Sequence, residues 1–149
     1  MLTEDVKDSI SESVLCWLAT SNKKGEPNCS PKEVFTVSEQ AELVIANIAS
    51  PESVENVTAN PNVCVSFVHV FKQKGFKLKG QARYVPSSSS DFAVFMSLVK
   101  PVVGTTFKVN GFIVVSVTSV TPIIAPAYYM VKGTTEASQI SSAKKAYGV

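Results

Sequence analysis

The sequence predicts an α+β protein that consists mainly of antiparallel strands. About six short segments rich in β-branched and aromatic residues alternate with brief turn sequences, which is typical of strands joined by hairpins. A helical pattern lies between two of these segments, and further helical patterns lie at both ends of the chain. Together, these three observations predict an antiparallel β-barrel with peripheral helices.

The first half of the chain is expected to contain two helices and three strand segments. The apolar residues of 3–12 recur at helical spacing among polar neighbours, so this segment predicts an amphipathic helix. Apolar runs bounded by turn residues predict strands over 14–20, 28–37 and 43–49. Ser50 suits the N-cap and Pro51 the first position of a helix over 51–59, which an Asn-Pro pair would end.

The second half contains the clearest strand pattern of the chain. Residues 76–84 alternate between apolar or small side chains on one face and basic or polar ones on the other. The small Gly80 and Ala82 indicate either a crowded barrel interior or a close backbone approach. We expect further strands over 63–71 and 111–120, and an interrupted one over 121–130. A helix is expected to end at Pro101, and a polar C-terminal helix is expected within 134–149.

The composition is that of one globular domain. With 149 residues, 45% of them hydrophobic, residues 1–149 are expected to form a single domain with its own core. Fourteen basic and twelve acidic residues give a formal charge of +2, which is too balanced to favour nucleic-acid binding. The acidic N-terminal segment is unlike a secretory signal, and no apolar run reaches membrane-spanning length, so no membrane association is expected.

The three cysteines favour a reducing compartment. Cys16, Cys29 and Cys64 lie far apart in apolar or alternating stretches. We therefore expect reduced thiols packed in the core rather than a disulfide framework or a zinc site, and a cytoplasmic protein.

The junction between the strand 43–49 and the helix 51–59 is a candidate anion-binding site. The free N–H groups of Glu52 and Ser53 would point outward at the positive end of the helix dipole, beside the Ser50 and Ser53 hydroxyls. The alternative is that Ser-Pro-Glu at this position is only an ordinary helix-capping signal. The local sequence leaves both interpretations open.

Several short motifs occur in an order and spacing that indicate a known family. They are Leu18-Ala19-Thr20, Gly25-Glu26-Pro27-Asn28, Ser30-Pro31-Lys32-Glu33, the block 45–57, Asn60-Pro61-Asn62-Val63 and Lys79-Gly80-Gln81-Ala82. This ordered set resembles the pyridoxamine 5′-phosphate oxidase-like, FMN-binding split-barrel proteins. The resemblance implies a six-stranded antiparallel split β-barrel that forms a homodimer, with FMN held between the two subunits. The apolar strand 111–120 agrees with a surface that one subunit cannot cover alone.

The resemblance also implies where the cofactor lies. It places the flavin phosphate at the start of the helix 51–59, facing Ser50 and Ser53, and the isoalloxazine ring along the preceding strand. The residues offered to the ring are Ala46, Asn47 and Ile48. Asn56 matches a family position that carries Asn or Gln, and it either ties the helix to the strand or is an exposed helical residue.

One departure from the family pattern concerns the charge at the phosphate. Family members commonly carry Lys or Arg in the first turn of this helix, whereas this chain has Glu52. Because a phosphate is unfavourable beside an unpaired carboxylate, Glu52 is expected to point to solvent and another cation to bind the phosphate. Lys32 is the first candidate for that cation and Lys74 the second.

The resemblance implies redox chemistry without identifying a substrate. The chain lacks the Arg- and His-bearing C-terminal segment of the true oxidases, so vitamin B6 oxidation is not expected. His69 has no evident nucleophile or carboxylate partner and is interpreted as structural. The first hypothesis is therefore a small FMN-dependent oxidoreductase. A non-catalytic flavin carrier or sensor is the alternative, and a barrel that has lost FMN because of Glu52 is the third.

Overall fold

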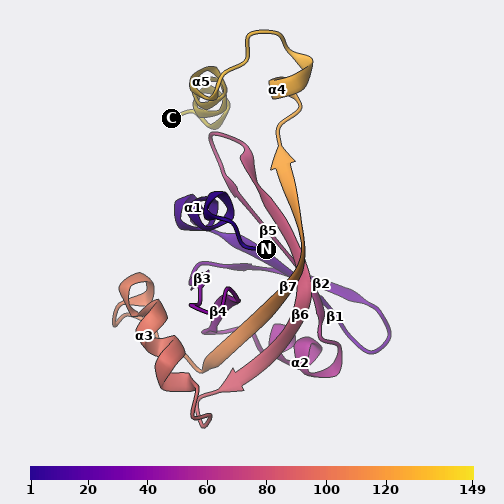
Figure 1. Cartoon of the computed structure of the whole chain (residues 1–149), viewed down its shortest axis with the longest axis vertical. Coiled ribbons are helices and arrows are strands. Elements are labelled where there is room, and N and C mark those ends of the chain that lie inside the picture. Colours follow the sequence, from indigo (N-terminus) through magenta and orange to yellow (C-terminus); the bar gives the residue numbers. More distant parts are fainter.

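The chain forms one strongly rolled antiparallel sheet, with some helices packed against it and others beyond one of its ends (Figure 1). The computed structural model describes residues 1–149. The strands are β1 (Cys16–Ser21), β2 (Pro27–Lys32), β3 (Phe35–Val37), β4 (Leu43–Asn47), β5 (Asn62–His69), β6 (Lys74–Pro86) and β7 (Gly111–Ile124). The helices are α1 (Glu4–Glu12), α2 (Pro51–Ala59), α3 (Phe92–Val103), α4 (Ala127–Met130) and α5 (Glu136–Tyr147). The predicted α+β, mainly antiparallel fold class is confirmed.

The sheet is rolled because its two edge strands are almost consecutive in the chain. Its strand order is β2-β1-β5-β6-β7-β4-β3, and all neighbouring strands are antiparallel. Only Glu33 and Val34 separate β2 from β3, so the Cα atoms of Lys32 and Phe35 lie at most about 10 Å apart. No strand pairing joins these two edges, so the barrel is split along the seam between β2 and β3.

The seam also explains why the sheet has seven strands where six were expected. The segment 28–37, predicted as a single strand, is divided between the two edges of the sheet. At the division, the backbone O of Val34 accepts a hydrogen bond from the Ala46 N–H at 2.9 Å. This bond directs the chain from β2 toward β4, so β3 pairs with β4 instead of continuing beside β1.

Two prolines interrupt the structure less than expected. Pro101 lies inside α3, which continues to Val103 because Val99 and Val103 are buried and packing holds the last turn. The strand β7 runs through Pro122 without a break. Since β4 pairs only with residues 111–115 of β7, Pro122 has a strand neighbour on one side only, where proline is tolerated.

Two apolar cores stabilise the sheet, one inside the barrel and one under α3. The helix α1 contributes Val6 and Ile10 to the barrel interior. On the other side of the sheet, α3 packs Phe95 against Phe112, with ring centroids 5.6 Å apart. Because each core contains residues from several strands, both faces of the sheet are held in one curvature.

The alternation predicted for residues 76–84 is confirmed in β6. Leu78, Gly80 and Ala82 are buried, and the intervening residues are exposed. A Cβ atom built on Gly80 would collide with the backbone O of Ser116, beside a bulge in the pairing of β6 with β7. Of the two interpretations of the small residues, the structure shows the close backbone approach at Gly80.

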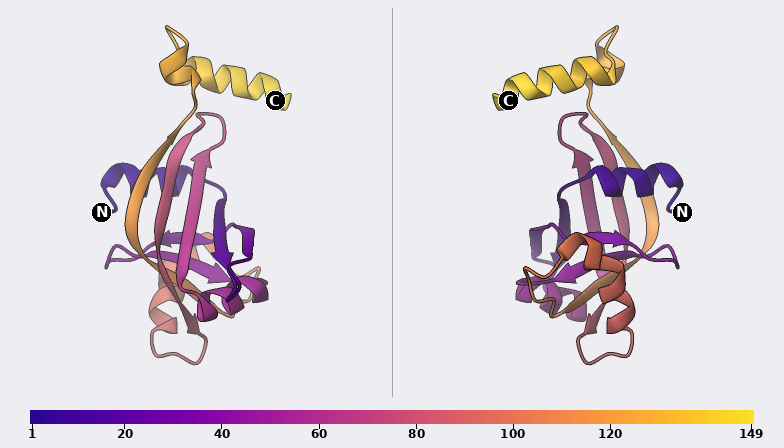
Figure 2. Two further views of the ribbon diagram at one scale, coloured as in Figure 1. Left: turned by 90° about the vertical axis from the view of Figure 1, so that its right-hand side faces the viewer. Right: turned by 90° about the vertical axis from the view of Figure 1, so that its left-hand side faces the viewer.

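The C-terminal segment lies beyond one end of the barrel, at the tip of the hairpin between β5 and β6 (Figure 2). Gln139 of α5 donates to Gln73 Oε1 at 3.0 Å, and Tyr128 of α4 donates to the Lys72 backbone O at 2.8 Å. These contacts attach α4 and α5 to the hairpin. None of the helices combines the length and the apolar character needed to cross a lipid bilayer.

The cysteines are free, as expected, but they are not all in the core. Cys16 is buried, Cys64 is half-buried and Cys29 is exposed. The expected core position is wrong for Cys29 because β2 is an edge strand, so one side of it has no neighbouring strand.

Candidate functional site

The seam places a buried lysine at the start of α2. Lys32 is the last residue of β2, and the closure of the barrel brings it to the junction between β4 and α2. Its Nζ donates to Ser30 Oγ at 3.0 Å, to Ser53 Oγ at 3.2 Å and also to Ser50 Oγ. The site therefore combines one ammonium group with three hydroxyl groups from β2, from the β4–α2 junction and from α2.

The charge of Lys32 has no counter-ion within the chain. Lys32 is only 5% exposed and forms no salt bridge. Cys16 lies opposite it in the pairing of β1 with β2, but burial raises the pKa of the Cys16 thiol to about 12, so this group is neutral near pH 7. Since a buried charge without a partner is costly, the site favours a bound anion.

Burial changes the acidity of the lysine itself. Desolvation lowers the pKa of Lys32 from its ordinary value, and only a charged Cys16 thiolate would raise it. Because that thiol stays protonated, the desolvation effect dominates. An anion placed near Nζ would restore the protonated form.

The backbone at the start of α2 adds further donors. Ser50 is the N-cap residue, but its side chain does not cap the helix and accepts from Lys32 instead. The N–H groups of Glu52 and Ser53 have no acceptor within the chain, and neither do those of Ile48 and Ala49. The structure therefore differs from an ordinary capping arrangement and leaves donors at the positive end of α2.

Of the three residues predicted to contact the flavin ring, two line a cleft beside Lys32 and the third is hydrogen-bonded within the chain. Ala46 and Ile48 line an open cleft of about 370 Å³ beside Lys32. The Asn47 side chain is already used within the chain, because its Nδ2 donates to the Tyr84 hydroxyl at 3.1 Å and its Oδ1 accepts from the Ser50 N–H at 3.1 Å. Asn47 thus shapes the junction instead of presenting a free amide.

Of the other residues considered for the site, Asn56 and Glu52 belong to α2, whereas Lys74 lies apart from Lys32. The buried Asn56 donates to Thr20 Oγ1 at 3.0 Å, which ties α2 to β1 and not to the strand before it. Glu52 is exposed, as the charge argument requires. Lys74 pairs with Glu136 of α5 at 3.2 Å, so within one chain it does not join Lys32.

The cleft also includes a residue that the sequence did not identify. Phe107, from the loop between α3 and β7, lines the cleft together with Lys32 and Ser50. No local pattern distinguishes it, because it lies in an irregular segment more than fifty residues from the helix start. Only the fold brings it to this site.

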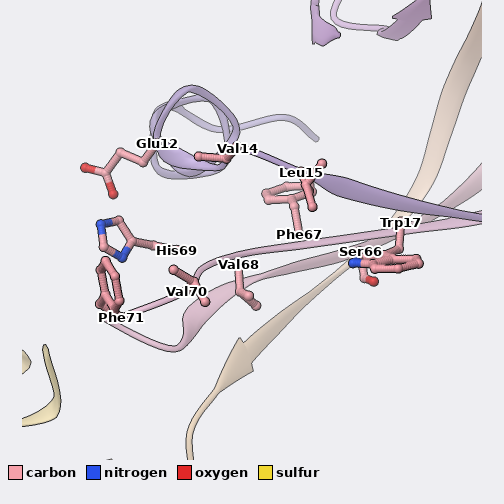
Figure 3. Close-up of a pocket in the computed structure, with 10 residues that line it drawn as sticks. All are labelled: Glu12, Val14, Leu15, Trp17, Ser66, Phe67, Val68, His69, Val70 and Phe71. Atoms are coloured by element: carbon pink, nitrogen blue, oxygen red, sulfur yellow. The ribbon is translucent and has the colours of Figure 1, made fainter. Parts of the chain in front are cut away.

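Figure 3 shows an apolar groove formed by β1, β5 and the segments beside them. The groove has a volume of about 500 Å³, and Leu15 lines both the groove and the cleft. Trp17 lies near one end and is 46% exposed, while Glu12 and His69 lie at the other. His69 Nδ1 accepts the Lys72 N–H at 3.1 Å, which gives this residue a structural contact.

The exposed apolar surface is therefore not where the sequence suggested. Residues 111–115 of β7 are fully buried within one chain, between β4, β6 and α3. Four of the exposed large apolar side chains lie together along β1 and β5 and in the segments beside them: Val14, Trp17, Val68 and Val70. This surface is a candidate contact for a second protein chain.

The fold and the site together define a class of split-barrel protein with a basic, hydroxyl-lined anion site at a helix N-terminus. Residues 2–108 match the sequence model of a family described as pyridoxamine 5′-phosphate oxidase. Because this match covers most of the chain, the protein belongs to the pyridoxamine 5′-phosphate oxidase family. The resemblance inferred from the ordered motifs is confirmed.

Solved structures share the fold at low sequence identity. HupZ from Group A Streptococcus has a TM-score of 0.70 and 19% identity, covering 84% of this chain and 96% of that chain. An FMN-binding protein from Syntrophomonas wolfei subsp. wolfei has a TM-score of 0.69 and 12% identity, covering 81% and 85%. A NimC/NimA family protein from Clostridium acetobutylicum has a TM-score of 0.63 and 19% identity, covering 84% and 89%. A comparison with curated proteins gave no match.

Proposed function

We propose that the protein is a homodimeric FMN-binding oxidoreductase. The observation that carries this proposal is Lys32, a buried ammonium group with hydroxyl partners and no counter-ion. Membership of the pyridoxamine 5′-phosphate oxidase family and a structural likeness to an FMN-binding protein support the choice of ligand.

The residues of the site fit the phosphate of FMN. A phosphate monoester carries a charge of about −1.5 to −2 near pH 7, which would compensate Lys32. The N–H groups of Glu52 and Ser53 and the Ser50 hydroxyl supply further donors to its oxygens. Ala46 and Ile48 would then lie beside the ring system, and the bound flavin would supply the electron-transfer chemistry.

A second copy of the chain would complete the cleft. The cleft is open to solvent, and Leu15 lines both the cleft and the apolar groove that contains Trp17. A second subunit seated on this groove would bury its apolar side chains and form the missing wall. We therefore place the dimer contact on the outer face of β1 and β5.

The first test compares FMN with riboflavin, which lacks the phosphate. FMN is expected to bind at least tenfold more tightly, because each charge-assisted hydrogen bond to the phosphate contributes about 1.5–3 kcal/mol. A fluorescence titration of the purified protein with each flavin measures the difference. Equal affinities would show that the phosphate is not bound at Lys32.

The same protein preparation tests whether the flavin turns over. Rapid reduction of the FMN-loaded protein by a nicotinamide nucleotide in stopped-flow measurements would support an oxidoreductase. Tight FMN binding without reduction by either nicotinamide nucleotide would favour the alternative, a flavin carrier or sensor.

FMN binding is expected to weaken at alkaline pH. The protonated Lys32 binds the phosphate, so affinity is present below its lowered pKa and is lost as the pH rises through that value. Over the same range the ligand-free protein should become more stable, because the unfolded lysine still holds its proton. FMN dissociation constants measured from about pH 7 to pH 10 test this expectation.

The matched control for this pH dependence is Lys32→Arg. The guanidinium group stays charged throughout the range, so the variant should keep its FMN affinity at a pH where the parent loses it. Superimposable pH profiles for parent and variant would contradict the assignment of Lys32.

A further inference from the structure

The loop between α3 and β7 holds an exposed aromatic side chain at the Lys32 cleft. Phe107 is 55% exposed, yet it lines the cleft that also contains Lys32 and Ser50. A phenyl ring left partly in water gains free energy when a flat apolar group covers it. The ring is therefore available to a ligand in the cleft.

The loop is attached to the functional junction by hydrogen bonds near Phe107. The Asn110 N–H donates to the Asn47 backbone O at 2.8 Å, and Asn110 Nδ2 donates to the Ile48 backbone O at 2.9 Å. Val109 is buried in the core under α3. These contacts hold the loop at the end of β4, so the position of Phe107 is linked to that of the proposed ring-binding residues.

The lining of the cleft is chemically divided. The polar part of the cleft consists of the Lys32 ammonium group, the Ser30 and Ser50 hydroxyls and the exposed Glu33. Its apolar lining includes Ile48 and Phe107. A ligand that matches both parts carries an anionic group and an aromatic ring system. An aliphatic phosphate would match the polar part only.

We propose that Phe107 recognises the ring system of the ligand and makes the cleft selective for aromatic phosphates over aliphatic phosphomonoesters. This inference rests on the proposed FMN site, because it assigns the part of the ligand that Lys32 does not contact. Phe107 acts here as a specificity-determining residue, and it takes no part in electron transfer.

The first experiment compares FMN with glycerol 3-phosphate by calorimetric titration. Phe107→Ala is expected to weaken FMN binding about fivefold, as for loss of one aromatic contact, and to leave glycerol 3-phosphate binding unchanged. Tyr129→Ala is the matched control, because Tyr129 of α4 is an aromatic residue that is 72% exposed and does not line the cleft. That control should bind both ligands like the parent.

The second experiment tests directly whether the side chain of residue 107 lies beside the bound flavin ring. An indole ring in contact with a flavin quenches its fluorescence by electron transfer, whereas a phenyl ring does not. Phe107→Trp is therefore expected to dim bound FMN relative to the parent while retaining its affinity, and Tyr129→Trp should not dim it.

The outcomes separate this inference from the proposed function. If the parent protein binds FMN and Phe107→Ala binds it equally well, the inference is overturned and the FMN site stands. An equal loss of FMN and glycerol 3-phosphate affinity would also overturn it, because Phe107 would then only shape the cleft. If the parent protein does not bind FMN, the proposed function itself fails.

Discussion

Replacing Lys32 by alanine or methionine is expected to weaken FMN binding at least tenfold, which corresponds to about 1.4 kcal/mol. The reason is that Lys32 is the only cation that the structure brings to the start of α2, and its Nζ already contacts the Ser50 and Ser53 hydroxyls. The ligand-free Lys32→Met protein should be at least as stable as the parent, because the substitution removes a buried charge that has no counter-ion.

A loss of FMN affinity without a loss of stability would distinguish a binding role of Lys32 from a structural one. If Lys32 were only structural, replacing it would lower the melting temperature, and any loss of FMN affinity would result from that loss of stability. FMN titration and thermal unfolding of the ligand-free protein measure the two effects separately. Lys24→Met is the control, since Lys24 is exposed in the turn between β1 and β2.

The substitution Glu52→Lys tests the same phosphate site by adding a positive charge instead of removing one. Glu52 is exposed at the first turn of α2, so a lysine there is expected to leave FMN binding unchanged or to strengthen it. If Lys32→Ala binds FMN like the parent while Lys74→Ala does not, the cation is Lys74, which a partner subunit would supply. If neither lysine matters, backbone and hydroxyl donors alone hold the phosphate.

Trp17→Asp is expected to convert a dimeric protein into a monomer. Trp17 projects from the outer face of β1 into the apolar groove, and it is the largest exposed aromatic side chain there. Truncating a buried tryptophan at an interface typically costs 2 kcal/mol or more, and a buried carboxylate adds a desolvation cost. We therefore expect dimerisation to weaken about a hundredfold or more, measured by sedimentation equilibrium.

The dimer prediction has a control and a linked readout. Val94→Asp changes an apolar residue of α3 that is 66% exposed and lies outside the groove, so it should leave the dimer intact. Because the groove and the cleft share Leu15, FMN affinity should fall together with dimerisation in Trp17→Asp. A parent protein that is monomeric at micromolar concentration would exclude both the dimer and a cleft shared between subunits.

Local sequence patterns were sufficient for most elements of the fold. The alternation of β6 and the Ser-Pro start of α2 are properties of consecutive residues, and the structure reproduces both. The ordered motifs were sufficient to identify the family, because their order and spacing fall within residues 2–108, which the family model matches. Prolines predicted the ends of elements less reliably. Packing allows α3 to continue past Pro101, and β7 contains Pro122 where one edge of the strand is unpaired.

The candidate site, in contrast, required the tertiary structure. From the sequence, Lys32 and Lys74 were both possible cations, and only the closure of the sheet at Glu33 and Val34 places Lys32 beside Ser50. The same closure divides the predicted strand 28–37 and leaves Cys29 exposed at an edge. The physical reason is that a strand pattern specifies which face a side chain occupies, but not which distant strand edge it meets. Phe107 reaches the cleft for the same reason, through a loop whose position depends on contacts with β4 and not on its own sequence.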